Sequence, residues 1–255
     1  MGIGGARVSE RAVSVGVRLN ALLTEAAQAT LDPAQSEQFE AYLSLILRWN
    51  LGVNLTAIRD EDGILRRHFV ESITCARALP AGIATLLDFG SGAGFPGIPI
   101  ALCRPEIAVT LAESQGKKAA FLREALRQLG LATRQSGERL DPEGGGGFNP
   151  RIRPLESTLA LALAGCSVHS GRAEVLRIVF DCVTLRAVDR MEVAVQAAAR
   201  LVRPGGWLAL MTTGRELNAL KAAAGPEFAW PEVHPQPGGE DRLLAIGKRE
   251  ISLPA

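Results

Sequence analysis

Hydrophobic residues in the first part of the chain recur with the period of an α-helix. Between residues 36 and 50 the apolar positions are three and four residues apart, which predicts a helix with one apolar face. These positions are Phe39, Leu43, Ile46 and Leu47. The same reasoning predicts a helix over residues 17–29, and a third helix capped by Asp60. Residues 1–15 are glycine-rich without a clear period, so we expect them to be poorly ordered.

Beyond these helices, short apolar runs alternate with amphipathic segments, which is typical of strands alternating with helices. Strands are predicted at residues 86–89, 107–112, 167–169, 180–185 and 207–211, and helices at residues 97–103, 115–129 and 191–201. A turn is predicted at residues 204–206, and residues 228–233 and 242–246 are predicted to form a closing antiparallel pair. The alternation predicts a Rossmann-like α/β fold with a mostly parallel twisted sheet and helices on both faces.

This pattern divides the chain into an N-terminal helical extension, residues 1–80, and a main domain, residues 81–255. The extension is expected to pack on the main domain. Within that domain, residues 132–166 form a connection of about 35 residues, far longer than such connections usually are. We interpret them as an insertion. The apolar run at residues 155–163 favours a mobile loop with a short docked helix over a functional lid.

The segment Leu86–Gly97 carries the most specific chemical signal. An apolar strand pattern containing Asp88 leads into Gly90, Gly92 and Gly94. Because glycine has no Cβ and accepts positive φ, such a loop lets a ligand lie against bare backbone. A glycine loop between a parallel strand and a helix predicts a nucleotide-type cofactor site. The alternative is a glycine-rich surface turn.

The residues around the loop discriminate among cofactors. A dinucleotide fingerprint requires glycine where this chain has Phe95, and the chain has no Gly-Lys-Ser/Thr phosphate loop. Asp88 and the glycine spacing fit S-adenosylmethionine better. Glu113 follows the next strand, roughly 20 residues beyond the glycines, where an acid can accept hydrogen bonds from ribose hydroxyls. The alternative for Glu113 is a solvated strand end.

The amino-acid composition limits which nucleic-acid, metal and membrane partners the protein is expected to have. The 255-residue chain has 28 basic and 27 acidic residues, a formal net charge of +1, so it is not a globally basic nucleic-acid binder. The four cysteines are scattered without a C-x-x-C pair, which fits a reducing compartment, and the three separated histidines predict no metal site. No membrane span or signal peptide is recognisable. We expect a monomeric cytoplasmic protein without a membrane partner.

Three sequence blocks carry a resemblance to a known family. They are Arg48–Phe69 with its Asn54-Leu55-Thr56 core, Asp88–Gly97 with Lys117-Lys118-x-x-Phe121-Leu122, and Gly171-Arg172-Ala173-Glu174 with Phe180-Asp181 and Arg186-Ala187-Val188. On these blocks the chain resembles the 16S ribosomal RNA guanine-N7 methyltransferase family, also called methyltransferase G or glucose-inhibited division protein B. The resemblance covers more than half of the chain.

The resemblance implies a class I, S-adenosylmethionine-dependent enzyme that methylates N7 of a guanine in small-subunit ribosomal RNA, free or in the assembled subunit. It places Gly90 and Phe95 at the cofactor and Ala173 and Glu174 at the adenine. It also places Arg186 near the acceptor, where this residue closes the site and counts among the cofactor-binding residues. Two departures from the family pattern stand out. The insertion separates the second block from the third, and residues 188–191 lack the usual apolar, proline-containing turn.

The expected chemistry needs little from the protein. Guanine N7 carries a free lone pair, so methyl transfer requires positioning and not a general base. We expect Arg186 to position the acceptor, either through guanine O6 or through a phosphate, and a structural ion pair is its alternative role. Two basic clusters are candidates for phosphate contacts, with solvated helix faces as the alternative. These RNA-binding candidates are Arg66, Arg67, Lys117, Lys118 and Arg123.

Other functions remain open at this stage. A methyltransferase acting on a small molecule or a protein would share the cofactor half, because a fold does not determine a substrate. A non-catalytic ribosome-binding or RNA-binding protein could retain a relic cofactor pocket. A nicotinamide oxidoreductase is disfavoured by Phe95.

Overall fold

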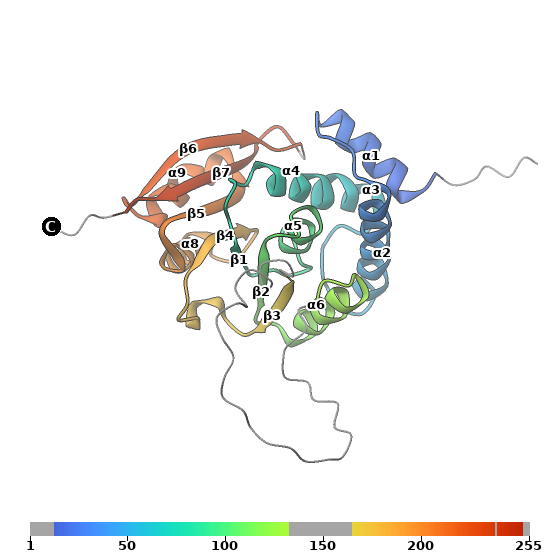
Figure 1. The fold of residues 1–255 in the computed structure, drawn as a ribbon, viewed down its shortest axis with the longest axis horizontal. Helices are drawn as coiled ribbons and strands as arrows, with labels where there is room; N and C mark the ends of the chain where they lie inside the picture. The colour runs from blue at the N-terminus through green and yellow to red at the C-terminus, as the bar shows by residue number, and fades with distance from the viewer. Residues whose placement is uncertain (1–12, 133–164, 238, 252–255) are drawn as a thin grey trace, which may run out of the picture.

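The computed structural model describes residues 13–132, 165–237 and 239–251 of the chain. Its centre is a seven-stranded sheet with the order β3-β2-β1-β4-β5-β7-β6 (Figure 1). The strands are β1 (Thr85–Phe89), β2 (Ala108–Glu113), β3 (Cys166–Ser170), β4 (Phe180–Arg186), β5 (Val202–Thr213), β6 (Phe228–Pro235) and β7 (Arg242–Arg249). Strands β1 to β5 pair in parallel, and β7 is antiparallel to both β5 and β6. The predicted α/β class and the closing antiparallel pair are confirmed.

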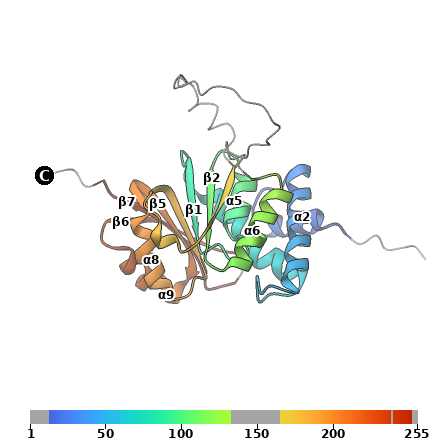
Figure 2. The ribbon, with the colours of Figure 1, turned by 90° about the horizontal axis from the view of Figure 1, so that it is seen from below.

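Helices lie on both faces of the sheet (Figure 2). They are α1 (Val15–Glu25), α2 (Pro33–Asn50), α3 (Glu61–Ile64), the π-helical segment η1 (Leu65–Val70), α4 (Glu71–Ala78), α5 (Gly97–Cys103), α6 (Gly116–Gln128), the 3-10 turn η2 (Ala173–Val175), α8 (Met191–Arg200) and α9 (Gly214–Ala224). On one face α5 and α6 contact β2, and α2 packs over both. On the other face α8 contacts β4 and β5, and α9 contacts β5 to β7.

The N-terminal helices pack against the sheet and its helices because their apolar faces belong to the same hydrophobic core. Leu19, Phe39 and Ile73 belong to the same hydrophobic cluster as Leu86 of β1. Local signals set their ends: Asp32 and Gln35 form a reciprocal capping box at the start of α2. As predicted, Asp60 caps the third helix by accepting a hydrogen bond from Gly63 N at 2.6 Å. That helix continues through η1 into α4.

Three features differ from the sequence expectations. Strand β5 begins at Val202, and residues 203–206 bulge opposite Asp181, because Phe180 pairs with Val202 and Cys182 with Trp207. The predicted Pro-Gly-Gly turn is therefore a bulge within a strand. Helix α9 was not predicted, although Leu217, Leu220 and Ala224 follow a helical spacing and are its buried positions. The expectations for residues 1–12 and for most of the 132–166 segment lie outside the described residues.

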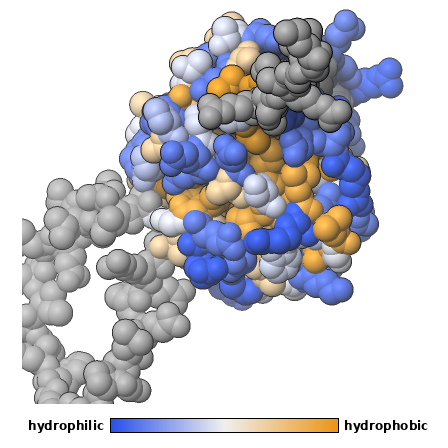
Figure 3. Space-filling view, turned by 90° about the vertical axis from the view of Figure 1, so that its right-hand side faces the viewer, coloured by the Kyte–Doolittle hydropathy of each residue, from blue (hydrophilic) through white to orange (hydrophobic). Residues whose placement is uncertain are grey.

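The surface over the N-terminal helices is mixed in character. Figure 3 shows apolar surface bordered by hydrophilic side chains on this side. Val17 of α1 is 59% exposed, and Leu51, just after α2, is 90% exposed. Apolar side chains therefore interrupt the hydrophilic surface on this side of the molecule.

Candidate functional site

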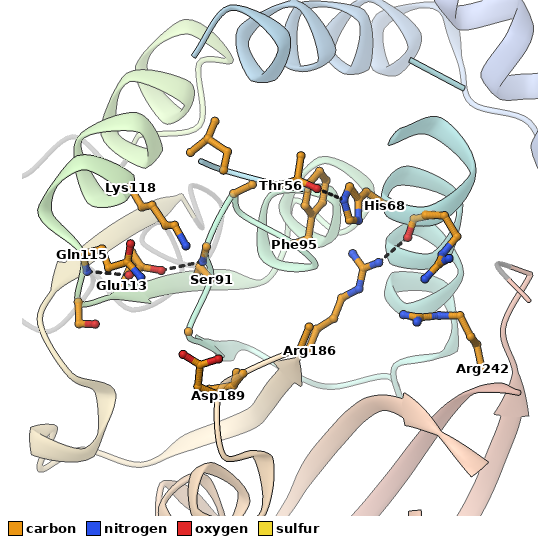
Figure 4. A pocket seen from close by; sticks show the side chains of 18 residues that line it. Thr56, His68, Ser91, Phe95, Glu113, Gln115, Lys118, Arg186, Asp189 and Arg242 are labelled. Atoms are coloured by element: carbon orange, nitrogen blue, oxygen red, sulfur yellow. Dashed lines mark hydrogen bonds between the residues drawn. The ribbon is translucent and has the colours of Figure 1, made fainter. Parts of the chain in front are cut away.

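A cavity of about 490 Å³ lies at the carboxyl ends of β1, β2 and β4. Strands β2 and β4 flank β1 and receive crossovers on opposite faces, so the cavity sits where an open α/β sheet usually binds its ligand. Figure 4 shows the side chains that line it. They are Leu55, Thr56, Arg67, His68, Gly90, Ser91, Gly92, Ala93, Phe95, Glu113, Ser114, Gln115, Lys118, Arg186, Ala187, Val188, Asp189 and Arg242.

The glycine loop forms one wall of this cavity. Its first amides bond to the end of β2, with Gly90 N and Ser91 N donating to Ala112 O at 3.0 and 2.9 Å. Gly92 has a φ of +55°, and a Cβ built on it would meet only the carbonyl oxygen of Gly90, at 4.0 Å. A ligand in the cavity can therefore approach the backbone at Gly92 closely.

Glu113 fastens this loop to the next helix. Its carboxylate accepts hydrogen bonds from Gly92 N at 2.9 Å and from Gln115 N at 2.7 Å. The side chain is largely buried and lines the cavity. Because each carboxylate oxygen has two lone pairs, Glu113 keeps acceptor capacity for a ligand hydroxyl.

Asp88 and Gly94, both predicted to contact the cofactor, are not among the described residues that line the cavity. Asp88 lies beneath the loop, where it accepts hydrogen bonds from Thr184 Oγ1 at 3.0 Å and Gly97 N at 3.2 Å. Burial raises the pKa of Asp88 to about 6. A Cβ on Gly97 would lie 2.3 Å from Leu111, so only glycine fits there. Gly94 faces the interior beside Tyr42. Both predicted residues shape the loop from behind.

An aromatic wall separates the glycine loop from the N-terminal helices. The ring of Phe95 stacks on His68, with centroids 4.6 Å apart, and the guanidinium carbon of Arg186 lies 5.8 Å from the Phe95 centroid. His68 Nε2 is 2.7 Å from Thr56 Oγ1. Burial, followed by the charges of Arg186 and Arg67, lowers the pKa of His68 to about 3, so the imidazole is neutral at physiological pH.

The Asn54-Leu55-Thr56 block is folded so that it reaches the cavity. The buried Asn50 side chain accepts hydrogen bonds from Leu55 N at 2.9 Å and Thr56 N at 3.2 Å, and donates to Thr56 O at 3.1 Å. Arg59 donates to the carbonyl of Asn50 at 2.8 Å. This network fixes the loop after α2 and holds Thr56 against His68.

At the opposite end of the cavity, three arginines surround one buried carboxylate, that of Glu71. Glu71, the first residue of α4, is fully buried and accepts a hydrogen bond from Arg186 Nη2 at 2.7 Å. Arg242 Nε lies 2.8 Å and Arg67 Nε 3.5 Å from Glu71 Oε1. Arg186 also donates to the backbone carbonyl of Arg67. In Figure 4, Arg186 and Arg242 lie away from Glu113 and Gln115, across the cavity.

The remaining predicted residues are scattered. Arg67 and Lys118 line the cavity, whereas Arg66 pairs with Glu25 at 3.2 Å and Arg123 bonds to Ser170. Lys117 is exposed on α6. Ala173 is buried in a hydrophobic cluster with Phe89 and Ala112, and Glu174 is exposed beside it. Neither lines the cavity formed by the described residues.

Several site residues were missed from the sequence. Glu71 interrupts an apolar helix face, four residues after Arg67, and that isolated charge was a usable signal. No sequence motif or spacing around Arg242 or Asp189 marks either residue as part of a site. Asp189 lies in a loop flanked by Ala187 and Arg190, both with a φ of +50°. Such a loop conformation cannot be predicted from composition or from hydrophobic periodicity.

Comparison with known proteins places these features in a family. The profile described as GidB, rRNA small subunit methyltransferase G, matches residues 35–142. A protein named ribosomal RNA small subunit methyltransferase G from Xanthomonas euvesicatoria pv. vesicatoria (strain 85-10) is 35% identical over 238 residues, covering 90% of this chain and 95% of that protein. The chain belongs to the rRNA small subunit methyltransferase G family. The resemblance found in the sequence is confirmed, and with it the expected class of enzyme.

Within the rRNA small subunit methyltransferase G family, a relative from Roseiflexus sp. (strain RS-1) is 52% identical over 101 residues, covering 40% of this chain and 43% of the relative. Solved structures support the fold alone. An O-methyltransferase from Bacillus cereus has a TM-score of 0.52 and 14% identity, covering 91% of this chain and 97% of that one. Cofactor-bound Rv0187 from MTB has a TM-score of 0.51 and 18% identity, covering 95% and 100%.

Two features are absent from the part of the chain that the structure describes. Within the described ranges, no helix is long and apolar enough to cross a membrane. In the same part of the chain, no group of three or more His, Cys, Asp or Glu side chains is arranged to hold a metal ion.

Proposed function

We propose that this protein is an S-adenosylmethionine-dependent methyltransferase that methylates N7 of a guanine in small-subunit ribosomal RNA. The observation that carries the proposal is the family membership, which extends over 90% of the chain and rests on relatives named for small-subunit ribosomal RNA. The structure supports it in one respect: the glycine loop and the family's Asn-Leu-Thr block line the same cavity.

The residues that line the cavity suit the chemical groups of S-adenosylmethionine. The open backbone at Gly92 and the acceptor capacity of Glu113 suit a nucleoside, and the carboxylate of Asp189 suits the cationic sulfonium. Gly90, Phe95 and Glu113 would hold the cofactor, while Asp88 and Gly94 would maintain the loop. By resemblance, Ala173 and Glu174 would lie toward the adenine. When bound, the cofactor supplies an electrophilic methyl group.

The residues at the other end suit an acceptor that needs no deprotonation. Guanine N7 presents its lone pair without a general base, so the protein has only to orient the base and exclude water. His68 is neutral and therefore adds no charge beside the ring, which becomes cationic on N7 methylation. Arg186 is held by Glu71 and can orient the acceptor strand.

We further propose how the larger substrate is held. Residues 1–80 would act as an extension that completes the acceptor end through Thr56, Arg67 and His68. Lys118 would contact RNA at the cavity, and Lys117, Arg123 and Arg66 would do so outside it. The substrate is either free ribosomal RNA or the assembled subunit. A ribosomal substrate also requires the cytoplasmic location expected from the sequence, and we expect the enzyme to act as a monomer.

A direct test uses labelled S-adenosylmethionine with unmodified small ribosomal subunits, free small-subunit ribosomal RNA and bulk transfer RNA in parallel. Chemical cleavage at N7-methylguanine then locates the label. A single labelled guanine in the small-subunit RNA is the expected result. Label on transfer RNA, or intact cofactor binding with no label on any RNA, would overturn the proposal in favour of another methyl acceptor.

A further inference from the structure

The arginine cluster, defined as Arg67, Arg186 and Arg242 around Glu71, has an unbalanced charge. Three guanidinium groups against one carboxylate leave two positive charges. Among the described ion pairs, these arginines meet no carboxylate other than Glu71. The side chain of Arg186, 6% exposed, is already paired with Glu71 at 2.7 Å. Those of Arg242 and Arg67 are 22% and 43% exposed, so the excess positive charge lies where an anion in the cavity can reach it. The cluster therefore has the composition of an anion site.

The geometry directs the spare donors toward the cavity. Glu71 is fully buried and lies behind the arginines, whereas all three arginines line the cavity. They come from three separate elements: Arg67 from η1, Arg186 from the end of β4 and Arg242 from the start of β7. Glu71 engages Nη2 of Arg186, so the other guanidinium nitrogens of that residue remain able to donate. Glu71 acts as a positioning residue because it contacts all three arginines and holds their guanidinium groups close together at the cavity.

The chemistry of the reaction selects the kind of anion. An arginine usually reads guanine through O6 and N7 together, but here N7 must face the methyl group. Methylation also places a positive charge on the guanine ring, which two uncompensated arginine charges nearby would oppose. A phosphodiester bound at the cluster carries one negative charge, so it offsets one of the two excess positive charges, and its two non-bridging oxygens can accept paired hydrogen bonds from a guanidinium group.

We propose that Glu71 and the three arginines form a binding site for a backbone phosphodiester of the RNA strand that carries the target guanine. The proposal rests on the proposed function, because it assigns the ligand of the acceptor end. It gives a substrate-binding role to Arg242, which had no sequence signal, and a specific ligand to Arg67, which the sequence already marked as an RNA-binding candidate. The carboxylate of the cofactor's methionine part has related chemistry and is the competing source of the anion.

The test compares full-length Arg242→Gln with wild type and with Arg200→Gln. Arg200 loses the same charge but is exposed at the end of α8, next to the start of β5 and therefore at the edge of the sheet opposite the cavity. Binding of unmodified small-subunit ribosomal RNA transcript is measured across a potassium chloride series, and binding of S-adenosylhomocysteine by calorimetry. Thermal melting checks folding, and Arg67→Gln, at a side chain 43% exposed, is the second variant if Arg242→Gln unfolds.

Arg242→Gln is expected to weaken RNA binding at least fivefold and to lower the salt slope by about 0.7 to 0.9, the effect of one phosphate contact. Binding of S-adenosylhomocysteine should change less than twofold, and Arg200→Gln should behave as wild type. A loss confined to S-adenosylhomocysteine, or equal losses for both ligands, would assign the cluster to the cofactor carboxylate and overturn the proposal. Unchanged binding of both would leave the cluster a purely structural ion pair. Failure of the proposed function is distinguishable, since wild type itself would then methylate no small-subunit RNA.

Discussion

The two ends of the cavity are built in different ways. The glycine end comes from two short contiguous stretches, the loop after β1 and the residues after β2, and its ligand-facing groups are largely backbone. The acceptor end brings together Thr56, Arg67, Arg186 and Arg242 from four separated parts of the chain, and its ligand-facing groups are side chains. The first is defined by local conformation and the second by tertiary packing.

This difference predicts a division of labour that mutation can test. Changes at the glycine end should act on cofactor affinity, whereas changes at the acceptor end should act on methyl transfer with the cofactor still bound. A variant that affects both equally would show that the two ends are not separate.

The largest effect is expected for Arg186→Ala. The variant removes the most buried guanidinium of the acceptor end, while Glu71 keeps Arg242 as a partner, which limits the loss of stability. Methyl transfer should fall at least about 100-fold, the usual consequence of misplacing a reactant by about 1 Å. Initial rates on small-subunit ribosomal RNA measure this. Calorimetry with S-adenosylhomocysteine should give wild-type affinity, and undiminished turnover would contradict the role of Arg186.

The glycine end could be predicted from the sequence more completely than the acceptor end, because one depends on local conformation and the other on tertiary packing. The glycine loop, Glu113 and Lys118 could be located because strand, loop and helix are consecutive, and local patterns report consecutive structure. Arg186 was located only through a family resemblance. Glu71 and Arg242 meet because α4 and β7 are brought together by folding, and no local spacing encodes that meeting.

For Asp88, the sequence predicted the position of a special residue but not the direction of its side chain. The sequence marked it as a special acid within an apolar strand, but did not indicate whether its carboxylate would face a ligand or the protein. Its partners are Thr184 on the neighbouring strand and the amide of Gly97. The strand register that pairs Asp88 with Thr184 decides the question, and register emerges only from the assembled sheet.

A smaller effect is expected at the glycine end from Glu113→Ala. The variant leaves the amides of Gly92 and Gln115 without their carboxylate acceptor and loosens the loop. Affinity for S-adenosylhomocysteine should fall by about 2 kcal/mol, the scale of a hydrogen bond to a charged group, or roughly 30-fold. Turnover at saturating cofactor should stay within a few-fold of wild type. The matched variant Glu113→Gln keeps one acceptor oxygen and should lose less, and equal affinities for all three proteins would refute this role.

The smallest effect concerns pH and separates the two ends most cleanly. At the acceptor end, the pKa of His68 is about 3 when folded against an ordinary 6.5, so between these values the unfolded chain binds more protons and stability rises with pH. At the glycine end, the pKa of Asp88 is about 6 when folded against an ordinary 3.8. There the folded chain binds more protons, and stability falls as pH rises. Between about pH 5 and pH 6 the two contributions oppose each other.

Two single substitutions should therefore tilt the stability profile in opposite directions. Each group contributes up to about 1.4 kcal/mol per pH unit, so the change across this interval is about 1 kcal/mol. Relative to wild type, His68→Gln should lose stability as pH rises through the interval, because only the Asp88 contribution remains. Asp88→Asn should gain stability over the same interval, because only the His68 contribution remains. Its amide can still accept from Gly97 N and donate to Thr184, which preserves the loop. Urea unfolding at several pH values measures both slopes, and slopes of the same sign would show that the two ends are not electrostatically distinct.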